Sequence, residues 1–183
     1  MDGEGAEKSS SKAHKKKAIT RLEAAVNIQK SGDYEKAEKM YLEIISKGHE
    51  IEAVYSNLGV IYKNTGREKM AINMYKKALE INPYFTGALS NLSNLLMKSN
   101  KLDEALKYVL KAVDIEPKSY ATNLNLSVIY AKKGETNKAL EVAKKVTTIK
   151  PESADGHYNL GIIYRKLNKT DKATESILRS IEL

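Results

Sequence analysis

The stretch EAVYSNLGVIYKNTGREKMAINMYKKALEINPYF, residues 52–85, decides the fold of this chain. Its apolar side chains recur three to four residues apart in each half, which is the spacing of one face of an α-helix. Gly66 separates the two halves and Pro83 follows the second one. Glycine accepts the left-handed backbone found just after a helix, and proline interrupts helices. We therefore expect two antiparallel helices, a tight turn between them and a short connection marked by proline.

The same pattern recurs along the chain with a period of 34 residues. Pro83, Pro117 and Pro151 are 34 residues apart, and residues 18–183 divide without insertion or deletion into five units, the last one shortened. The units are 18–51, 52–85, 86–119, 120–153 and 154–183. Position 20 of every unit is alanine, and position 8 is always alanine, glycine or serine. Small residues are required where two packed helices approach most closely, so these positions predict the contact within each pair.

A single helix pair cannot cover its own apolar face, so neighbouring pairs must stack. The predicted fold is therefore all-α, a solenoid of five helix-turn-helix units. Residues 1–17 contain no aliphatic side chain beyond Met1 and two alanines, and five of them are lysines. Such a segment buries too little apolar surface to offset the entropy of ordering. We predict that residues 1–17 form a disordered basic tail.

The pattern at positions 4, 7, 8, 11, 20, 24 and 32 resembles that of the tetratricopeptide repeat (TPR). The second unit carries it most completely, through Tyr55, Leu58, Gly59, Tyr62, Ala71, Tyr75, Ala78 and Pro83. The first unit departs from the pattern with Arg21 at position 4 and His49 in place of proline, and the fourth has Asn123 at position 4. The resemblance implies a right-handed superhelix. In it, positions 2, 5, 6, 9, 12 and 13 of the first helices face a bound peptide or partner helix.

Position 6 is the most informative of these rows. It is occupied by Glu23 in the first unit and then by four asparagines, Asn57, Asn91, Asn125 and Asn159. An asparagine amide both donates and accepts hydrogen bonds, so a row of them can hold an extended main chain whatever its side chains. The row is similar to the asparagine ladder in the repeat array of protein O-GlcNAc transferases. The alternative is that each asparagine bonds to the preceding turn of its own helix.

Other residues complete the predicted peptide-binding set. Asn94 stands at position 9 and Tyr158 at position 5, and positions 12 and 13 supply the cations Lys63, Lys98, Lys132, Arg165 and Lys166. Cations facing the groove would attract an acidic segment, although cations are also favoured near any helix C-terminus. A clamp for two carboxylates, as in chaperone-binding repeat domains, is not supported. The positions where that clamp needs cations hold Ser90, Asp155 and Asn159 instead.

Composition excludes several classes of function. The chain has no cysteine, and its three histidines lack the spacing of metal ligands, so we predict no metal, no cofactor and no enzymatic activity. No long apolar stretch and no apolar leader is present, which favours a cytoplasmic, non-membrane protein. The net charge of +8 raises the question of nucleic acid. At least six of the eleven tyrosines stand at packing positions, so a protein partner ranks above nucleic acid.

We predict a protein-interaction scaffold that binds an extended and acidic peptide or partner segment in the concave groove. Two alternatives stay open: an N-terminal adaptor of a larger transferase, and a self-associating structural array. The last alternative rests on the C-terminal helix, where no following helix covers the apolar face. That face consists of Ile177, Leu178, Ile181 and Leu183. We expect any homodimer to form through it.

Overall fold

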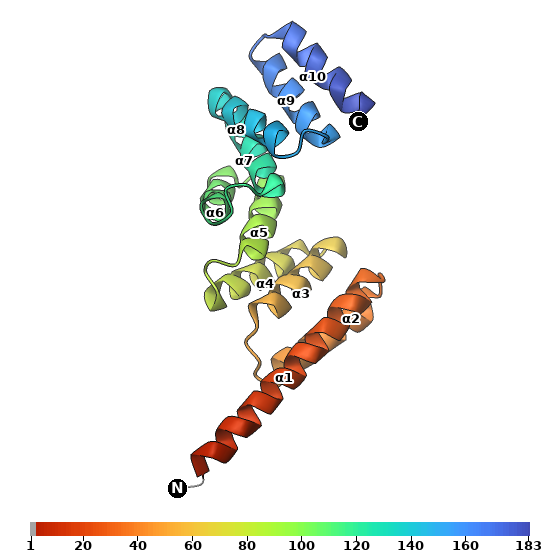
Figure 1. Ribbon diagram of the computed structural model, residues 1–183, viewed down its shortest axis with the longest axis vertical. Helices are drawn as coiled ribbons and strands as arrows, with labels where there is room; N and C mark the ends of the chain where they lie inside the picture. The colour runs from red at the N-terminus through yellow and green to blue at the C-terminus, as the bar shows by residue number, and fades with distance from the viewer. Residues whose placement is uncertain (1–2) are drawn as a thin grey trace. The chain divides into compact units, whose positions relative to one another are not determined.

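The computed structural model describes the backbone of residues 3–183 and the side chains of residues 16–183. Over this range the chain forms ten α-helices and no strand, as the sequence predicted (Figure 1). The helices are α1 (Gly3–Lys30), α2 (Tyr34–Ser46), α3 (Glu52–Asn64), α4 (Glu68–Ile81), α5 (Thr86–Lys98), α6 (Leu102–Ile115), α7 (Tyr120–Lys133), α8 (Thr136–Ile149), α9 (Ala154–Lys166) and α10 (Thr170–Glu182).

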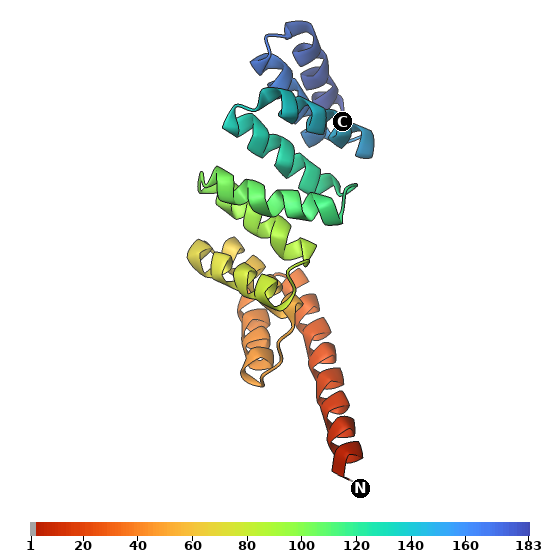
Figure 2. The ribbon, with the colours of Figure 1, turned by 90° about the vertical axis from the view of Figure 1, so that its left-hand side faces the viewer.

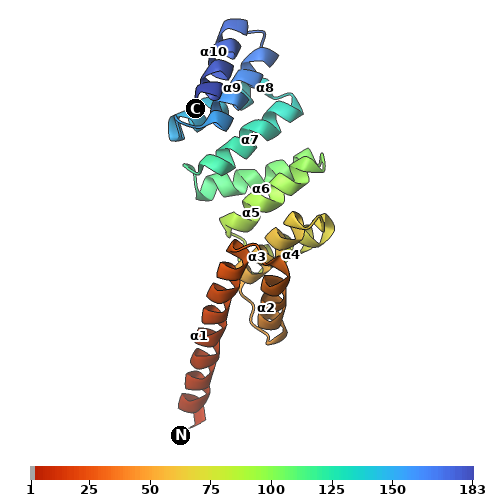
Figure 3. The same ribbon diagram turned by 90° about the vertical axis from the view of Figure 1, so that its right-hand side faces the viewer.

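The helices pair in chain order within two compact units, residues 1–85 and 86–183. In the first unit, α1 packs on α2 and α3 packs on α4, and α1 also contacts α3 (Figure 3). In the second unit the pairs α5–α6, α7–α8 and α9–α10 follow one another (Figure 2). There α5 contacts α7, and α7 contacts α9. The first helices of successive pairs within a unit therefore lie side by side, and their shared face is where a binding site was expected.

Each turn inside a pair contains one residue with a left-handed backbone. Within the pairs, the positive φ angles fall at position 15 of every repeat, at Gly32, Gly66, Asn100, Gly134 and Asn168. Gly48, in the connection after the first pair, also has a positive φ. Glycine and asparagine are the residues that adopt this conformation at least cost, and here they end the first helix. The predicted turn chemistry is confirmed in all five pairs.

Small residues occupy the closest approach between paired helices. Ala37, Ala71, Ala105 and Ala139 are fully buried. The hydroxyl of Ser93, at position 8, donates a hydrogen bond of 2.9 Å to the backbone carbonyl of Ala105. This bond shows that positions 8 and 20 meet across the pair, so a large side chain at either position would force the helices apart.

The first helix is longer than the repeat requires. α1 begins at Gly3, so the backbone of residues 3–17 is helical where the sequence analysis predicted disorder. Alanine, glutamate and lysine are strong helix formers, and a helix anchored at residues 18–30 can extend one residue at a time without a packed face. The side chains of residues 1–15 lie outside the described residues.

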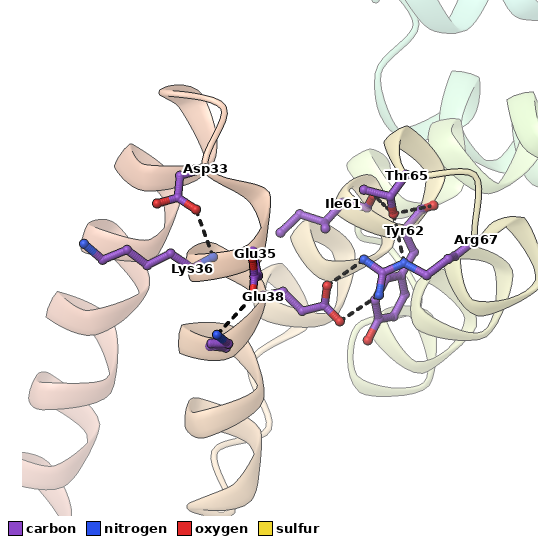
Figure 4. A network of polar contacts seen from close by, with 9 residues as sticks. Asp33, Glu35, Lys36, Glu38, Ile61, Tyr62, Thr65 and Arg67 are labelled. Atoms are coloured by element: carbon purple, nitrogen blue, oxygen red, sulfur yellow. Dashed lines mark hydrogen bonds and ion pairs between the residues drawn. The ribbon is translucent and has the colours of Figure 1, made fainter.

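A polar cluster fastens α2 to the turn between α3 and α4 (Figure 4). The guanidinium of Arg67 donates two hydrogen bonds to the carboxylate of Glu38, at 2.9 and 2.6 Å. The same guanidinium lies 4.3 Å from the ring centre of Tyr62, and its Nε donates to the Thr65 hydroxyl at 2.9 Å. The bonds to Glu38 raise the pKa of Arg67. Two parallel bonds and a stacked ring fix the guanidinium plane, so the cluster sets how successive pairs meet in residues 1–85.

Two buried tyrosines at position 24 differ in how their hydroxyls are satisfied. The Tyr41 hydroxyl donates a 2.7 Å hydrogen bond to Oε1 of Gln29. Burial raises the pKa of Tyr41 to about 12, opposed by a hydrogen bond from the Asn57 side chain. The Tyr75 hydroxyl is buried with no hydrogen-bond partner among the described residues, and burial raises its pKa as well. The two rings thus occupy equivalent sites with opposite polar environments.

Replacing each of these tyrosines by phenylalanine should change stability in opposite directions. Tyr75→Phe removes an unsatisfied buried hydroxyl and should raise the free energy of unfolding by about 1 kcal/mol. Tyr41→Phe leaves Gln29 and Asn57 without their partner and should lower it by about 1 kcal/mol. Urea unfolding followed by circular dichroism measures both. Equal effects of the two changes would show that the Tyr75 hydroxyl is bonded in solution.

Candidate binding face

A pocket of about 500 Å³ lies between α1 and α3. Its lining consists of Leu22, Glu23, Val26, Asn27, Ala53 and Asn57. Five of these six residues stand at positions 2, 5, 6 and 9 of their units, which are among the positions expected to face a bound segment. Within each compact unit, we call the surface formed by positions 2, 5, 6 and 9 of the first helices the binding face of that unit. In residues 1–85 the structure shows that these positions share one hollowed surface.

The equivalent positions in residues 86–183 lie on α5, α7 and α9. Two hydrogen bonds cross between these helices close to the binding face. The hydroxyls of Ser90 on α5 and Thr122 on α7 are 3.0 Å apart. The amide of Asn159 on α9 donates to the Ser127 hydroxyl on α7 at 2.6 Å. The binding face of this unit is therefore held together by polar contacts between consecutive pairs.

The four asparagines at position 6 are all half-buried, but their amides are used differently. Asn57 bonds to the Tyr41 hydroxyl, and Asn159 bonds to Ser127, both in the preceding pair. Neither bond goes to the preceding turn of the same helix, so the local alternative is wrong for these two residues. Asn91 and Asn125 have no hydrogen-bond partner among the side chains of residues 16–183. Their amides are available to a ligand.

The predicted cations do not behave as one group. Lys98, Lys132 and Arg165 are exposed. Lys63 is half-buried and engaged in an interaction within the chain. Lys166 is also exposed, but its ammonium donates a 2.7 Å hydrogen bond to the backbone carbonyl of Ala131 on α7. Lys166 therefore ties α9 to the preceding pair, a role that the sequence analysis missed.

Asn64, which also stands at position 13, reaches back to the preceding helix pair as Lys166 does. The Asn64 amide donates to the Tyr34 hydroxyl of α2 at 3.2 Å. Both side chains leave the last turn of a first helix and reach the preceding pair. Position 13 thus contributes to stacking in two of the repeats. The long polar side chains at position 13 are the feature of the sequence from which these contacts between pairs could have been predicted.

The remaining predicted residues lie at the binding face with different exposure. Asn94 is half-buried, and Tyr158 is 55% exposed. The large exposure of an aromatic ring at position 5 leaves its face open to a ligand. An exposed aromatic side chain is a common contact in protein recognition because it offers a large rigid surface.

The C-terminal helix exposes part of its apolar face. Leu178, Ile181 and Leu183 are 54%, 75% and 42% exposed. Ile177 is different, because a Cβ built on Gly161 of α9 would lie only 2.6 Å from Ile177 Cγ1. Ile177 therefore contacts α9 and does not belong to the exposed part of this face. It packs within its own pair at position 24.

The described residues contain no group of three histidine or carboxylate side chains placed to hold a metal ion. Within the same part of the chain, no helix combines the length and apolar character needed to cross a membrane.

Models of the tetratricopeptide repeat match residues 53–85, residues 86–119 and 154–183, and residues 128–168. Together they cover more than half of the chain. The chain belongs to the tetratricopeptide repeat family. No curated protein matches it significantly.

Solved structures of other repeat proteins have the same fold. MamA from Desulfovibrio magneticus is 20% identical with a TM-score of 0.81, and the match covers 91% of this chain and 94% of MamA. YrrB, described as a TPR protein with an unusual peptide-binding site, is 23% identical with a TM-score of 0.77, covering 96% and 90%. PilF of Pseudomonas aeruginosa is 15% identical with a TM-score of 0.83, covering 93% and 78%. Because all three sequence identities are below 25%, this structural similarity establishes a shared fold and nothing further.

Proposed function

We propose that this chain is a non-enzymatic protein-interaction module that holds an extended polypeptide segment on its binding face. The observation that carries the proposal is the pair of free amides on Asn91 and Asn125. They stand one repeat apart on adjacent helices, half-buried and without a partner among the described residues. A half-buried amide without a partner gains most from a ligand that supplies the missing hydrogen bonds. The peptide-binding site named for YrrB supports a similar use of the fold here.

The row of asparagines is proposed to contact main chain rather than side chains. An extended peptide presents alternating carbonyl and amide groups, and one asparagine amide can bond to both kinds. Asn57 and Asn159 keep part of this capacity, because each amide group has two donors and one acceptor and the structure uses one donor. Asn94 and Tyr158 would contact side chains of the segment. The exposed cations Lys98, Lys132 and Arg165 would favour acidic residues in the part of the segment near α5, α7 and α9.

The other hypotheses receive less support. The matched family models are those of the repeat alone, so a transferase adaptor is not favoured. The exposed leucines and isoleucine of α10 are consistent with self-association through the C-terminal helix, which stays a proposal. A cytoplasmic location stays a prediction.

The proposal is tested with peptides selected from a random dodecapeptide phage library on the intact chain. Replacing both free amides, Asn91→Ala with Asn125→Ala, removes two hydrogen-bonding groups. Each of the two groups contributes about 1 kcal/mol to binding, so we expect the dissociation constant of a selected peptide to rise about thirtyfold. Fluorescence anisotropy measures it, and the melting temperature should stay within about 2 °C of the parent because neither amide has a hydrogen-bond partner among the described residues.

The matched control replaces two exposed asparagines of second helices, Asn73→Ala with Asn137→Ala. This variant makes the same chemical change away from the binding face and should bind as the parent does. If both double variants bound the selected peptides equally well, the asparagine row would not be the binding site. If the library gave no enriched peptide, the proposed function would fail.

A further inference from the structure

Glu23, which lines the pocket between α1 and α3, and Asp155 on α9 are the two charged residues at the positions that define the binding faces. Glu23 holds position 6 in the first repeat, where the four later repeats have asparagine. It is the only charged residue among the six that line the pocket. The pocket therefore carries a negative charge at the place where the neighbouring repeat offers a neutral amide.

The Glu23 carboxylate is exposed and, like those of Glu50, Glu68 and Glu80, makes no ion pair among the described residues; it differs from these three in lining a pocket. Glu35 pairs with Lys39, Glu38 with Arg67, and Glu43 with both Lys47 and Arg21. On α1 the neighbours of Glu23 three and four residues away are Ile19, Thr20, Val26 and Asn27, which carry no charge. An uncompensated carboxylate beside a pocket attracts cations and repels acidic groups.

The rest of the lining suits a long side chain that ends in a cation. Leu22, Val26 and Ala53 offer apolar surface, on which the methylene stem of a lysine or arginine can lie while its charged end stays in polar surroundings. The amide oxygens of Asn27 and Asn57 can accept hydrogen bonds from that end. A volume of about 500 Å³ is more than one such side chain needs, and it is within the range of pockets that hold ligands.

We propose that this pocket receives a lysine or arginine side chain of the bound polypeptide and so selects for a basic residue at one place in the segment. The inference rests on the proposed function, because the segment must first lie along the binding face. The methylenes contact Leu22, Val26 and Ala53, and the cation pairs with the carboxylate of Glu23. The pocket thus adds side-chain specificity to a main-chain contact that has none of its own.

The test repeats the dodecapeptide selection on the parent chain, on Glu23→Gln and on Glu23→Lys. Peptides selected on the parent should share a lysine or arginine at one register position. The preference for a basic residue should vanish with Glu23→Gln, which keeps the shape of the side chain and loses its charge. With Glu23→Lys the selected peptides should carry an acidic residue at that position instead. Glu80→Gln, an exposed change on α4, is the matched control and should give the parent's preference.

Affinity measurements on one selected basic peptide complete the test. We expect Glu23→Gln to weaken binding about five- to tenfold, as for a charge-assisted contact at a partly open site. The difference in affinity between the parent and Glu23→Gln should become smaller when the ionic strength rises from about 0.01 M to about 1 M, because the Debye length then falls to about 3 Å. Norleucine in place of the basic residue should weaken binding of the parent similarly and should leave Glu23→Gln unaffected.

Several outcomes would overturn the inference. Enriched peptides without a basic position, or with one that persists in Glu23→Gln, would refute the role of the pocket and leave the proposed function standing. An absence of any enriched peptide would remove both. A dimer in sedimentation that is lost in Glu23→Gln would assign the pocket to basic residues of a second copy and refute the proposed occupant.

Discussion

Gly161→Val should lower the free energy of unfolding by about 3 kcal/mol and should unfold the last helix pair first. A Cβ at this position would lie 2.6 Å from Ile177 Cγ1 and 3.2 Å from the backbone carbonyl of Ala173. The carbonyl belongs to α10 and cannot yield without moving the helix. A β-branched side chain adds two more methyl groups at the same contact, so α9 and α10 must separate.

The contacts of this pair decide which helices are affected. Among the described helices, α9 contacts α7, α8 and α10. In stacked repeats each pair depends on its neighbours, so damage inside one pair opens that pair locally before the pairs that it does not contact. Hydrogen exchange should therefore quicken in α9 and α10 and change little in α5 and α6.

Gly156→Ala in the same helix is the control for Gly161→Val. There the three atoms nearest to a Cβ all belong to side chains, and the nearest is Val146 Cγ1 at 3.3 Å. Because a side chain can rotate and alanine favours helix, we expect the free energy of unfolding to fall by less than about 1 kcal/mol. Equal losses of unfolding free energy in Gly161→Val and Gly156→Ala would show that the close approach of α9 and α10 at Gly161 does not limit the size of the residue there.

The features fixed by local chemistry were predictable from the sequence. Left-handed backbone at Asn100 and Asn168 follows from residue type and spacing alone. Burial of Ala105 and its contact with Ser93 follow from the rule that close helices need small residues. These predictions needed only the repeat period, because every pair solves the same packing problem.

The contacts between pairs were not predictable in the same way. The bonds from Asn159 to Ser127 and from Lys166 to Ala131 depend on how far one pair is turned against the next. The period fixes which positions recur but leaves this angle open. For the same reason the sequence placed four equivalent asparagines in one row, and the structure divides them into two that bond within the chain and two without a partner among the described residues. The pocket beside Glu23 also follows from the packing of α1 against α3 and had no sequence signal beyond the break in the row.

Ala139→Leu should be as damaging as Gly161→Val but should act over a longer part of the chain. Ala139 of α8 is fully buried in a cluster with side chains from α7, α9 and α10. That cluster contains Ala131, Ala143, Leu160, Ile163, Tyr164 and Ala173. A leucine adds three carbon atoms to a close-packed contact, and we expect a loss of about 3 kcal/mol in the free energy of unfolding.

The expected exchange pattern separates this variant from Gly161→Val. Ala139 packs within its own pair and against the following one, so its replacement weakens both at once. Hydrogen exchange should quicken together in α7, α8, α9 and α10, whereas Gly161→Val affects α9 and α10. Ala121→Leu, an exposed change on α7, is the control and should leave stability within about 0.5 kcal/mol of the parent. If Ala139→Leu quickened exchange in α7 and α8 alone, the two pairs would not share a core, and each would owe its stability to its own contacts.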